Sequence, residues 1–210
     1  MKKGPIMADV DQGLFKRARD GDRDAFWSLI LPYRGLIYSV ALGMLRNAEQ
    51  AGDELHDVLL IAFRSVSNLR DPAKLPSWLY AITRNHIYDR TRREKRLRLA
   101  AQDAARGTGQ VVAITEITEK EEWLTRMERA MERLPEPFRV ILGMKYMNDY
   151  SCREIADILD ITVPAVKSRL FEARKVLRKN MEALASRDGG AASRSGGPAS
   201  KKEVRNHEMP

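Results

Sequence analysis

Two amphipathic segments, one short and one long, follow each other between Tyr150 and Lys179 with a three-residue turn between them. Ser151, with Glu154 three residues later, matches the capping box that begins a helix. Thr162 can cap a second helix, and Pro164 is tolerated there because the first turn of a helix needs no amide donor. These signals predict a short helix, a tight turn and a longer helix.

The second of these predicted helices has a basic outer face. Four apolar residues share its inner face: Val166, Leu170, Ala173 and Leu177. Between Thr162 and Asn180 there are six Lys and Arg residues and one acid, Glu172. This arrangement is helix-turn-helix geometry, which places the N-terminal half of the second helix in a DNA major groove, where Arg and Lys reach guanine edges or phosphates. The candidate duplex-reading residues are Pro164, Ala165, Lys167, Ser168, Arg169, Glu172, Arg174 and Lys175.

An ordinary helical hairpin with a solvated basic face is the alternative interpretation of this segment. Its charge asymmetry argues against that alternative, because a merely soluble helix usually mixes both signs. Cys152 is the only cysteine of the chain. It is interpreted as a small helix residue, since no second thiol exists to resolve an oxidised form.

The charge balance of the whole chain indicates a polyanionic partner. The sequence has 37 Lys and Arg residues against 29 Asp and Glu, a formal net charge of +8. Nucleic acid is the leading candidate and a membrane surface the second. The longest apolar stretches, such as Val58 to Phe63, are too short to cross a bilayer, and the N-terminus lacks the apolar core of a signal peptide. We therefore expect no membrane insertion and a cytoplasmic location.

Helical periodicity divides the 210 residues into two patterned blocks. The stretch 100–118 between them loses the amphipathic pattern, and the stretch after residue 185 is rich in Gly, Ser and Ala, which cannot offset the entropy of ordering. We predict an all-α fold of two small helical domains. The expected boundaries are a first domain at 9–98, a flexible linker at 99–120, a second domain at 121–185 and a disordered tail at 186–210.

A helix predicted at Ser77 to Arg98 combines cations with aromatic side chains. Between Arg84 and Arg98 seven Lys and Arg residues accompany only two acids. Cations follow the phosphates of a single strand while aromatic rings stack on unpaired bases. Trp78 at the helix start is equally well interpreted as a core residue, and His86 is interpreted as a packed residue rather than a ligand.

The helix that follows Asn47 carries acidic residues. Asn47 and Gln50 resemble an N-cap pair. Asp53 and Asp57 lie four residues apart with Glu54 beside them, so we expect three carboxylates on one exposed face. Such a face repels DNA and suits docking to a basic or polar protein surface. A simple solvated face is the alternative.

Two blocks of motifs together resemble one family. Leu134-Pro135, Phe138-Arg139, Tyr150-Ser151, Glu154 to Ala156 and Val166 to Leu170 resemble domain four of the extracytoplasmic-function class of sigma factors. Asp22 to Phe26, Tyr33-Arg34, Ala51 to Phe63 and Trp78 to Asn85, with Asp89, Arg92 and Arg93, resemble domain two of the same class. Both blocks stand in the family's order and cover roughly residues 9 to 182, so the chain is identified as a member of that class.

The resemblance implies a transcription initiation factor that directs core RNA polymerase to specific promoters as part of a stress response. It implies that the helix-turn-helix reads the −35 element as duplex. Domain two would melt the −10 element and read it as a single strand, with one base flipped into a pocket of the loop at 71–77. The residues assigned to the −10 element are Lys74, Ser77, Trp78, Tyr80, Arg84, Asn85, Tyr88, Arg92 and Arg93.

The same resemblance implies protein partners. The residues expected to bind the coiled coil of the polymerase β′ subunit are Asp53, Glu54, His56 and Asp57, where His56 stands at a position usually held by glutamine. The polymerase β flap is a second expected contact, and an anti-sigma factor is a further expected partner. The protein would associate with the nucleoid when it is bound to polymerase.

Three other classes of function are weighed against this one. An enzyme is not expected, and neither a cofactor nor a metal, because the sequence has no Gly-rich phosphate loop, nucleophile elbow or metal-ligand spacing. A dimeric helix-turn-helix regulator would bind duplex half-sites without polymerase and would not need the aromatic and basic helix. A helical adaptor that binds only protein is disfavoured by the net charge and by two separate basic helices.

Overall fold

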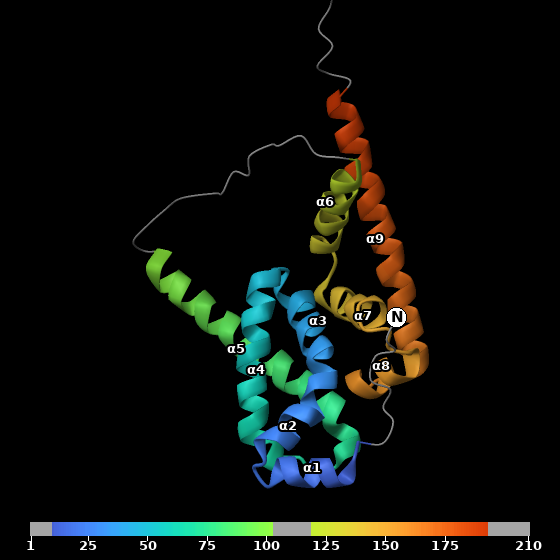
Figure 1. Ribbon diagram of the computed structural model, residues 1–210. Helices are drawn as coiled ribbons and strands as arrows, with labels where there is room; N and C mark the ends of the chain where they lie inside the picture. Colours follow the sequence, from blue (N-terminus) through green and yellow to red (C-terminus); the bar gives the residue numbers. More distant parts are fainter. Residues whose placement is uncertain (1–9, 103–118, 193–210) are drawn as a thin grey trace, which may run out of the picture.

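The computed structural model describes residues 10–102 and 119–192, and these ranges form helices without any strand. The first domain contains α1 (Gln12–Arg19), α2 (Arg23–Ile30), η1 (Leu31–Tyr33), α3 (Arg34–Leu45), α4 (Ala48–Ser65), η2 (Val66–Asn68), η3 (Pro72–Lys74) and α5 (Leu75–Gln102). The second contains α6 (Glu119–Glu132), α7 (Glu136–Tyr146), α8 (Cys152–Leu159) and α9 (Val163–Ala192) (Figure 1). The prediction of two small helical domains is confirmed.

The helix-turn-helix begins and ends where its local signals predict. The Glu154 carboxylate accepts from the Ser151 amide at 2.7 Å, and the Ser151 hydroxyl accepts from the Glu154 amide at 3.2 Å. Asp160 ends α8 in the left-handed conformation, with φ of 53°. The Thr162 hydroxyl then accepts from the Ala165 amide at 3.4 Å and caps α9. Local hydrogen bonds therefore define both helices of the motif.

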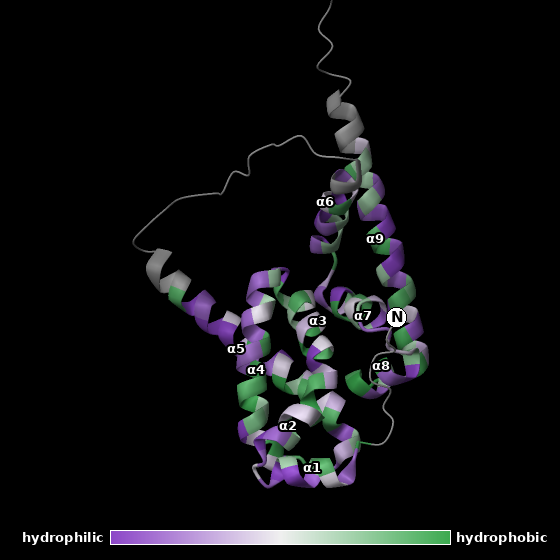
Figure 2. Ribbon diagram, viewed as in Figure 1, coloured by the Kyte–Doolittle hydropathy of each residue, from purple (hydrophilic) through white to green (hydrophobic). Residues whose placement is uncertain are grey.

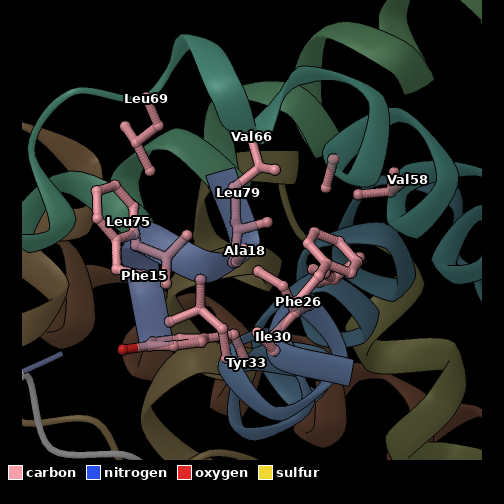
Figure 3. Close-up of a cluster of buried hydrophobic side chains, with 14 residues drawn as sticks. Phe15, Ala18, Phe26, Ile30, Tyr33, Val58, Val66, Leu69, Leu75 and Leu79 are labelled. Carbon is pink, nitrogen blue, oxygen red and sulfur yellow. The ribbon is translucent and has the colours of Figure 1, made fainter. Parts of the chain in front are cut away.

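The core of the first domain lies between α1, α2, α4 and the start of α5 (Figure 3). The Phe26 ring is fully buried and meets the Phe63 ring edge-on, with ring centroids 5.1 Å apart. Leu75 and Leu79 anchor α5 in this core at 0% exposure. Hydrophobic and hydrophilic residues alternate along these helices (Figure 2), and the apolar residues of the core cluster are the buried ones. Burial of one α5 face thus determines which α5 side chains remain outside.

Helix α3 packs against helices of both domains. It contacts α4 and α5 within its own domain and α7 of the second domain. Leu36 and Val40 of α3 are almost fully buried in a cluster that includes Ile141, Tyr150 and Ile155 of the second domain. The two domains are therefore packed together, a feature that the amphipathic patterns of the separate blocks did not predict.

Two expected boundaries need correction. Helix α5 continues past Arg98 to Gln102, and α9 continues past Ala185 to Ala192, where a disordered tail was expected. Once a helix is nucleated, each added residue gains one backbone hydrogen bond, so a weakly patterned stretch can extend it. Residue 9, most of the expected linker (103–118) and the rest of the expected tail (193–210) lie outside the described residues.

The continuous segment Arg23–Leu45 corrects a further expectation. It is long and apolar enough to cross a membrane by length and composition, although the longest apolar stretches of the sequence were expected to be too short. It comprises α2, η1 and α3, and half of its most apolar window is buried inside the protein. Phe26, Ile30 and Ile37 lie in the core of the first domain. The segment is thus the core layer of a folded domain.

The anchoring of α5 gives a test of this core. Leu79→Ala should lower the free energy of unfolding by roughly 2–5 kcal/mol, because it leaves a cavity at a fully buried position. Leu97→Ala on the same helix is the matched control, since Leu97 is 64% exposed, and should change stability by less than about 0.5 kcal/mol. Chemical denaturation followed by circular dichroism measures both. Equal losses would contradict this packing of α5.

Candidate nucleic-acid and polymerase interfaces

The N-terminal half of α9 presents the predicted duplex-reading face. Val166, Leu170 and Ala173 are buried against the rest of the second domain. The exposed side chains are Pro164, Lys167, Ser168, Arg169, Arg174 and Lys175, while Ala165 and Glu172 are half-buried. The Arg174 side chain donates from Nε to the Leu170 carbonyl at 3.1 Å, which holds its stem along the helix. Most of the predicted residues are therefore accessible on the side of α9 that is not packed against the domain.

Phe171 is a residue of this surface that the sequence reasoning missed. Its side chain is 61% exposed, although it lies among the cations of α9. It is four residues from both Lys167 and Lys175, so it shares their side of the helix. The sequence did contain a signal for Phe171, because an apolar residue there stands at a polar-face position of the predicted recognition helix. Such a ring can contact the methyl group of thymine in a major groove.

Helix α5 presents the second basic surface. Leu79, Thr83 and Ile87 are buried and fix its inner side. The exposed members of the predicted single-strand set are Lys74, Arg84, Asn85, Tyr88, Arg92 and Arg93. The Arg84 guanidinium lies 5.8 Å from the centre of the Tyr88 ring, a cation-π arrangement. A cation and an exposed ring therefore lie side by side on this helix.

Three other members of the single-strand set are partly covered. Trp78 is half-buried and packs against the core of the first domain, as its alternative interpretation held. Ser77 donates its hydroxyl to the Lys74 carbonyl at 3.0 Å. Tyr80 is half-buried against the cluster shared with the second domain. The free aromatic surface of α5 in this conformation is thus smaller than the sequence indicated.

Even the exposed ring of Tyr88 has a partner in the second domain. Its hydroxyl donates to the Glu136 carboxylate at 2.8 Å. This hydrogen bond, together with burial, raises the pKa of Tyr88 above its ordinary value. The contact joins α5 to the first turn of α7.

A pocket lies in the loop before α5, where a site for a flipped base was expected. Its volume is about 210 Å³, and its walls come from the loop, from η1 and from the start of α1. It is lined by Val10, Gln12, Tyr33, Asp71, Pro72, Ala73 and Pro76. The Asp71 carboxylate accepts from the Ala73 amide at 2.9 Å and shapes the loop. The expected loop therefore does form a cavity.

The outer face of α4 is acidic and partly apolar. Asn47 caps the helix by accepting from the Gln50 amide at 2.9 Å, as predicted. Asp53, His56 and Asp57 are exposed. Leu60, three residues after Asp57, is 51% exposed. Glu49, four residues before Asp53, is exposed as well, so the face combines three carboxylates, an imidazole and an apolar side chain.

Glu54 does not belong to that exposed face, and the expectation that it would was wrong. Its side chain is fully buried and binds the Arg90 guanidinium, while the His86 ring nitrogen Nδ1 lies 2.7 Å from its second oxygen. Arg90 also donates to Glu94 at 2.9 Å, and the pKa of Arg90 is raised by Glu94 and Glu54. Glu54 follows the spacing of two buried residues of α4, Ala51 and Val58, which places it on the inner side of the helix.

One helical domain carries a helix-turn-helix, and the other carries a basic, aromatic helix. Together they define a DNA-binding protein with two different DNA-binding domains. The family model described as Sigma-70 region 2 matches residues 29–97, and that described as Sigma-70, region 4 matches residues 124–177. The chain belongs to the extracytoplasmic-function RNA polymerase sigma factors of the sigma-70 family.

The chain aligns with individual relatives over most of their length. The chain is 29% identical to the sigma factor SigW of Bacillus subtilis, over 80% of this chain and 95% of that protein. It is 31% identical to SigM of Mycobacterium tuberculosis, over 76% and 78%. Two solved structures share the fold at 22% identity. CnrH in complex with the cytosolic domain of CnrY has a TM-score of 0.56, over 83% of this chain and 99% of that chain. RpoE in complex with the anti-sigma factor NepR from Bartonella quintana has a TM-score of 0.55, over 75% and 96%.

The buried carboxylate of Glu54 gives a second test. Glu54→Ala should lower the free energy of unfolding by roughly 1–3 kcal/mol, because Arg90 and His86 lose a charged hydrogen-bond partner inside the fold. Asp53→Ala, one residue earlier and exposed, is the control and should change stability by less than about 0.5 kcal/mol. Urea denaturation of both variants measures the difference. A Glu54→Ala protein as stable as the control would contradict the inward placement.

Proposed function

We propose that this sigma factor reads its promoters with two chemically different surfaces, duplex DNA with α9 and a single strand with α5. The observation that carries this division is the contrast between the two helices. Helix α9 exposes a short row of polar side chains after a capped N-terminus, which suits base edges in a groove. Helix α5 exposes arginines beside an aromatic ring, which suits phosphates and unstacked bases.

In the duplex-reading surface, Arg169 is the residue assigned to a guanine edge of the −35 element. Ser168 contributes a hydroxyl that can bond a base or a phosphate, and Phe171 meets a thymine methyl group. Pro164 and Ala165 bring the helix start close to the groove. Lys167, Glu172, Arg174 and Lys175 complete the surface, the cations along the phosphates and Glu172 as an acceptor towards cytosine.

In the single-strand surface, the loop pocket receives one flipped base of the −10 element. The pocket lies directly before α5, so a base held there leaves the following nucleotides beside Arg84 and Tyr88. Unpaired bases need both a stacking partner and a cation for the phosphates. The remaining residues of this surface are Lys74, Ser77, Asn85, Arg92 and Arg93, while Tyr80 and Trp78 take part only after the covering contacts are released.

The acidic face of α4 is the surface for core RNA polymerase, and Asp53, His56 and Asp57 with Leu60 bind the β′ coiled coil. Carboxylates that would repel DNA are exposed on this face of α4. The first two turns of α9, by contrast, contain no acidic residue. Glu54 acts inside the fold, where it holds α5 against α4. The β flap contacts the second domain. The protein works in the cytoplasm, and catalysis of RNA synthesis belongs to the polymerase.

An anti-sigma factor is a further partner, by analogy with RpoE, which was solved in complex with one. A groove of about 640 Å³ between the end of α3 and helices α6 and α7 supports this. Its apolar lining includes Leu42, Met127, Met131 and Met147, and charged residues of both signs also line it. Flexible methionine side chains adapt to the apolar face of a helix.

Substitutions on the two surfaces should separate the two kinds of reading. Arg169→Ala should weaken recognition of the −35 element by roughly 1–3 kcal/mol and relax its sequence preference. It should leave activity on a promoter that is already opened largely intact. Arg84→Ala with Arg92→Ala should impair opening of duplex promoters and binding of the non-template strand, with −35 recognition kept.

Run-off transcription with core polymerase on matched duplex and pre-opened promoters measures both effects. Lys175→Ala serves as a control for α9, because a phosphate contact should weaken binding uniformly across sequences. Equal losses of the Arg169 and Arg84/Arg92 variants on both templates would argue against two separate surfaces.

Charge reversal on α4 should weaken holoenzyme formation. Asp53→Lys with Asp57→Lys replaces two exposed carboxylates by cations, so a basic or polar docking surface would be repelled. Asp20→Lys with Asp24→Lys makes the same change of charge at two exposed positions, one directly after α1 and one in the first turn of α2, and is the matched control. Co-purification with core polymerase measures the yield. Wild-type yield for the α4 variant would exclude this face.

A further inference from the structure

One flank of α1 faces the loop that precedes α5. Gln12, at the start of α1, lines the loop pocket, and Lys16 and Arg19 follow it four and seven residues later. Residues at this spacing share one side of a helix. Phe15 and Ala18 are buried, so the adjacent side of α1 faces the core. The α1 flank (Gln12, Lys16 and Arg19) thus begins at the pocket and continues for roughly 10 Å, at about 1.5 Å per residue.

Two hydrogen bonds join this flank to the loop. Arg19 donates from Nε and from a terminal nitrogen to the Ser67 carbonyl, at 3.4 and 3.3 Å. The same guanidinium lies 5.8 Å from the centre of the Phe15 ring, which keeps the side chain along α1. Helix α1 also contacts η2, the short helix that contains Ser67. The α1 flank and the first part of the loop therefore lie side by side.

The loop turns polar side chains outward next to the flank. Leu69 is buried in the core of the first domain and fixes the loop there. Ser67, Asn68 and Arg70, on either side of it, are exposed. Helix α1 lies at the bottom of the first domain, and the last turns of α5 extend away from it (Figure 1). The flank and the loop thus form a polar surface apart from the basic part of α5.

The cations of this surface are available for a negatively charged ligand. Within the part of the chain that the structure describes, Lys16, Arg19 and Arg70 form no ion pair. Two acids stand next to them in the sequence, Asp20 and Asp71. The Asp71 carboxylate is engaged by a backbone amide of its own loop. Three cations therefore face solvent beside a pocket proposed to hold a nucleotide base.

A strand with one base in the loop pocket continues on both sides of that base. On one side, its proposed path runs beside Arg84 and Tyr88 of α5. On the other side, the pocket walls at Gln12 and Asp71 lead to the rest of the α1 flank and to Arg70. Cations spaced along a surface follow the phosphates of a single strand. The exposed members of this surface are polar and include no aromatic ring, so it suits the backbone and does not select bases.

We propose that the α1 flank, with Ser67, Asn68 and Arg70, is a second single-strand site. It binds phosphates of the non-template strand on the side of the flipped base away from α5. The inference rests on the proposed binding of that base in the loop pocket. A strand held on both sides of the flipped base returns to the duplex more slowly, so this site lengthens the lifetime of the open complex. Because it contacts the backbone, it acts on any sequence.

The salt dependence of DNA binding tests this site. Lys16→Ala with Arg70→Ala removes two of its cations and keeps Arg19, which also holds the loop. For the holoenzyme on a pre-opened promoter, each phosphate neutralised on a single strand adds about −0.7 to the slope of log affinity against log salt concentration. The slope for the double variant should therefore be less steep by about 1.4. Its open complexes should also dissociate faster when they are challenged with heparin.

Arg17→Ala with Arg64→Ala is the matched control, because it makes the same change of net charge elsewhere. Arg17 lies on another side of α1, where it pairs with Asp22 at 2.6 Å, and Arg64 is exposed on α4. The control should keep the wild-type slope, and both double variants should form holoenzyme at wild-type yield. An unchanged slope for the Lys16/Arg70 variant, or an equal change in the control, would overturn the proposal. A loss of holoenzyme only in the Lys16/Arg70 variant would overturn it too, because the flank would then bind polymerase.

Localised cleavage of the DNA tests where the strand lies. In a Cys152→Ser background, an iron chelate attached at Lys16→Cys should cleave the non-template strand of a pre-opened promoter bound by the holoenzyme. The same reagent attached at Leu97→Cys, an exposed position of α5, should cleave that strand on the other side of the flipped base. Absence of cleavage from position 16, or cleavage from both positions at the same nucleotides, would overturn the proposal.

The two cleavage positions distinguish a failure of the inference from a failure of the proposed function. Cleavage from position 97 alone would leave the single-strand role of α5 intact and refute the role of the α1 flank. Cleavage from neither position, with holoenzyme formed at normal yield, would refute the single-strand role of the whole first domain and the inference with it.

Discussion

The close approach of α3 to α7 is the contact on which the arrangement of the whole protein depends. Helix α3 supports α4 and α5 on one side and receives the second domain on the other. Because Gly43 and Gly143 bring the two backbones together, Leu36 and Val40 are buried against the second domain instead of facing solvent. The orientation of α5 and α9, the two helices proposed to read DNA, therefore depends on α3, which is not one of them.

This framework separates the charges of the protein into basic surfaces, an acidic surface and one buried ionic contact. Exposed cations gather on the outer faces of α5 and α9, among them Arg84 and Arg169, which we propose meet phosphates or bases. The carboxylates that remain exposed on α4 are Glu49, Asp53 and Asp57, and negative charge on that face would disfavour contact with DNA. Glu54, one residue along, is turned inward to hold Arg90, so the same helix provides an internal ionic contact and an external acidic face.

Features that depend on neighbouring residues were predictable from the sequence, and features that depend on distant contacts were not. The caps at Ser151 and Thr162 and the outward row at Lys167 to Arg169 follow from local spacing, and the structure has them. The inward turn of Glu54 depends on Arg90, 36 residues later, and three acids within five residues of sequence do not reveal such a partner. The docking through Arg139 joins residues 96 apart, and glycines in helical patterns do not name the helix that they meet.

Permanganate footprinting of a target promoter shows whether one domain recognises duplex DNA while the other holds an opened strand. Permanganate reacts with unpaired thymines, so it reports melting at single-base resolution. We expect reactive thymines around the −10 element only when core polymerase and this protein are both present, and none at the −35 element. Specific binding by the protein that leaves every thymine unreactive in the presence of polymerase would contradict it.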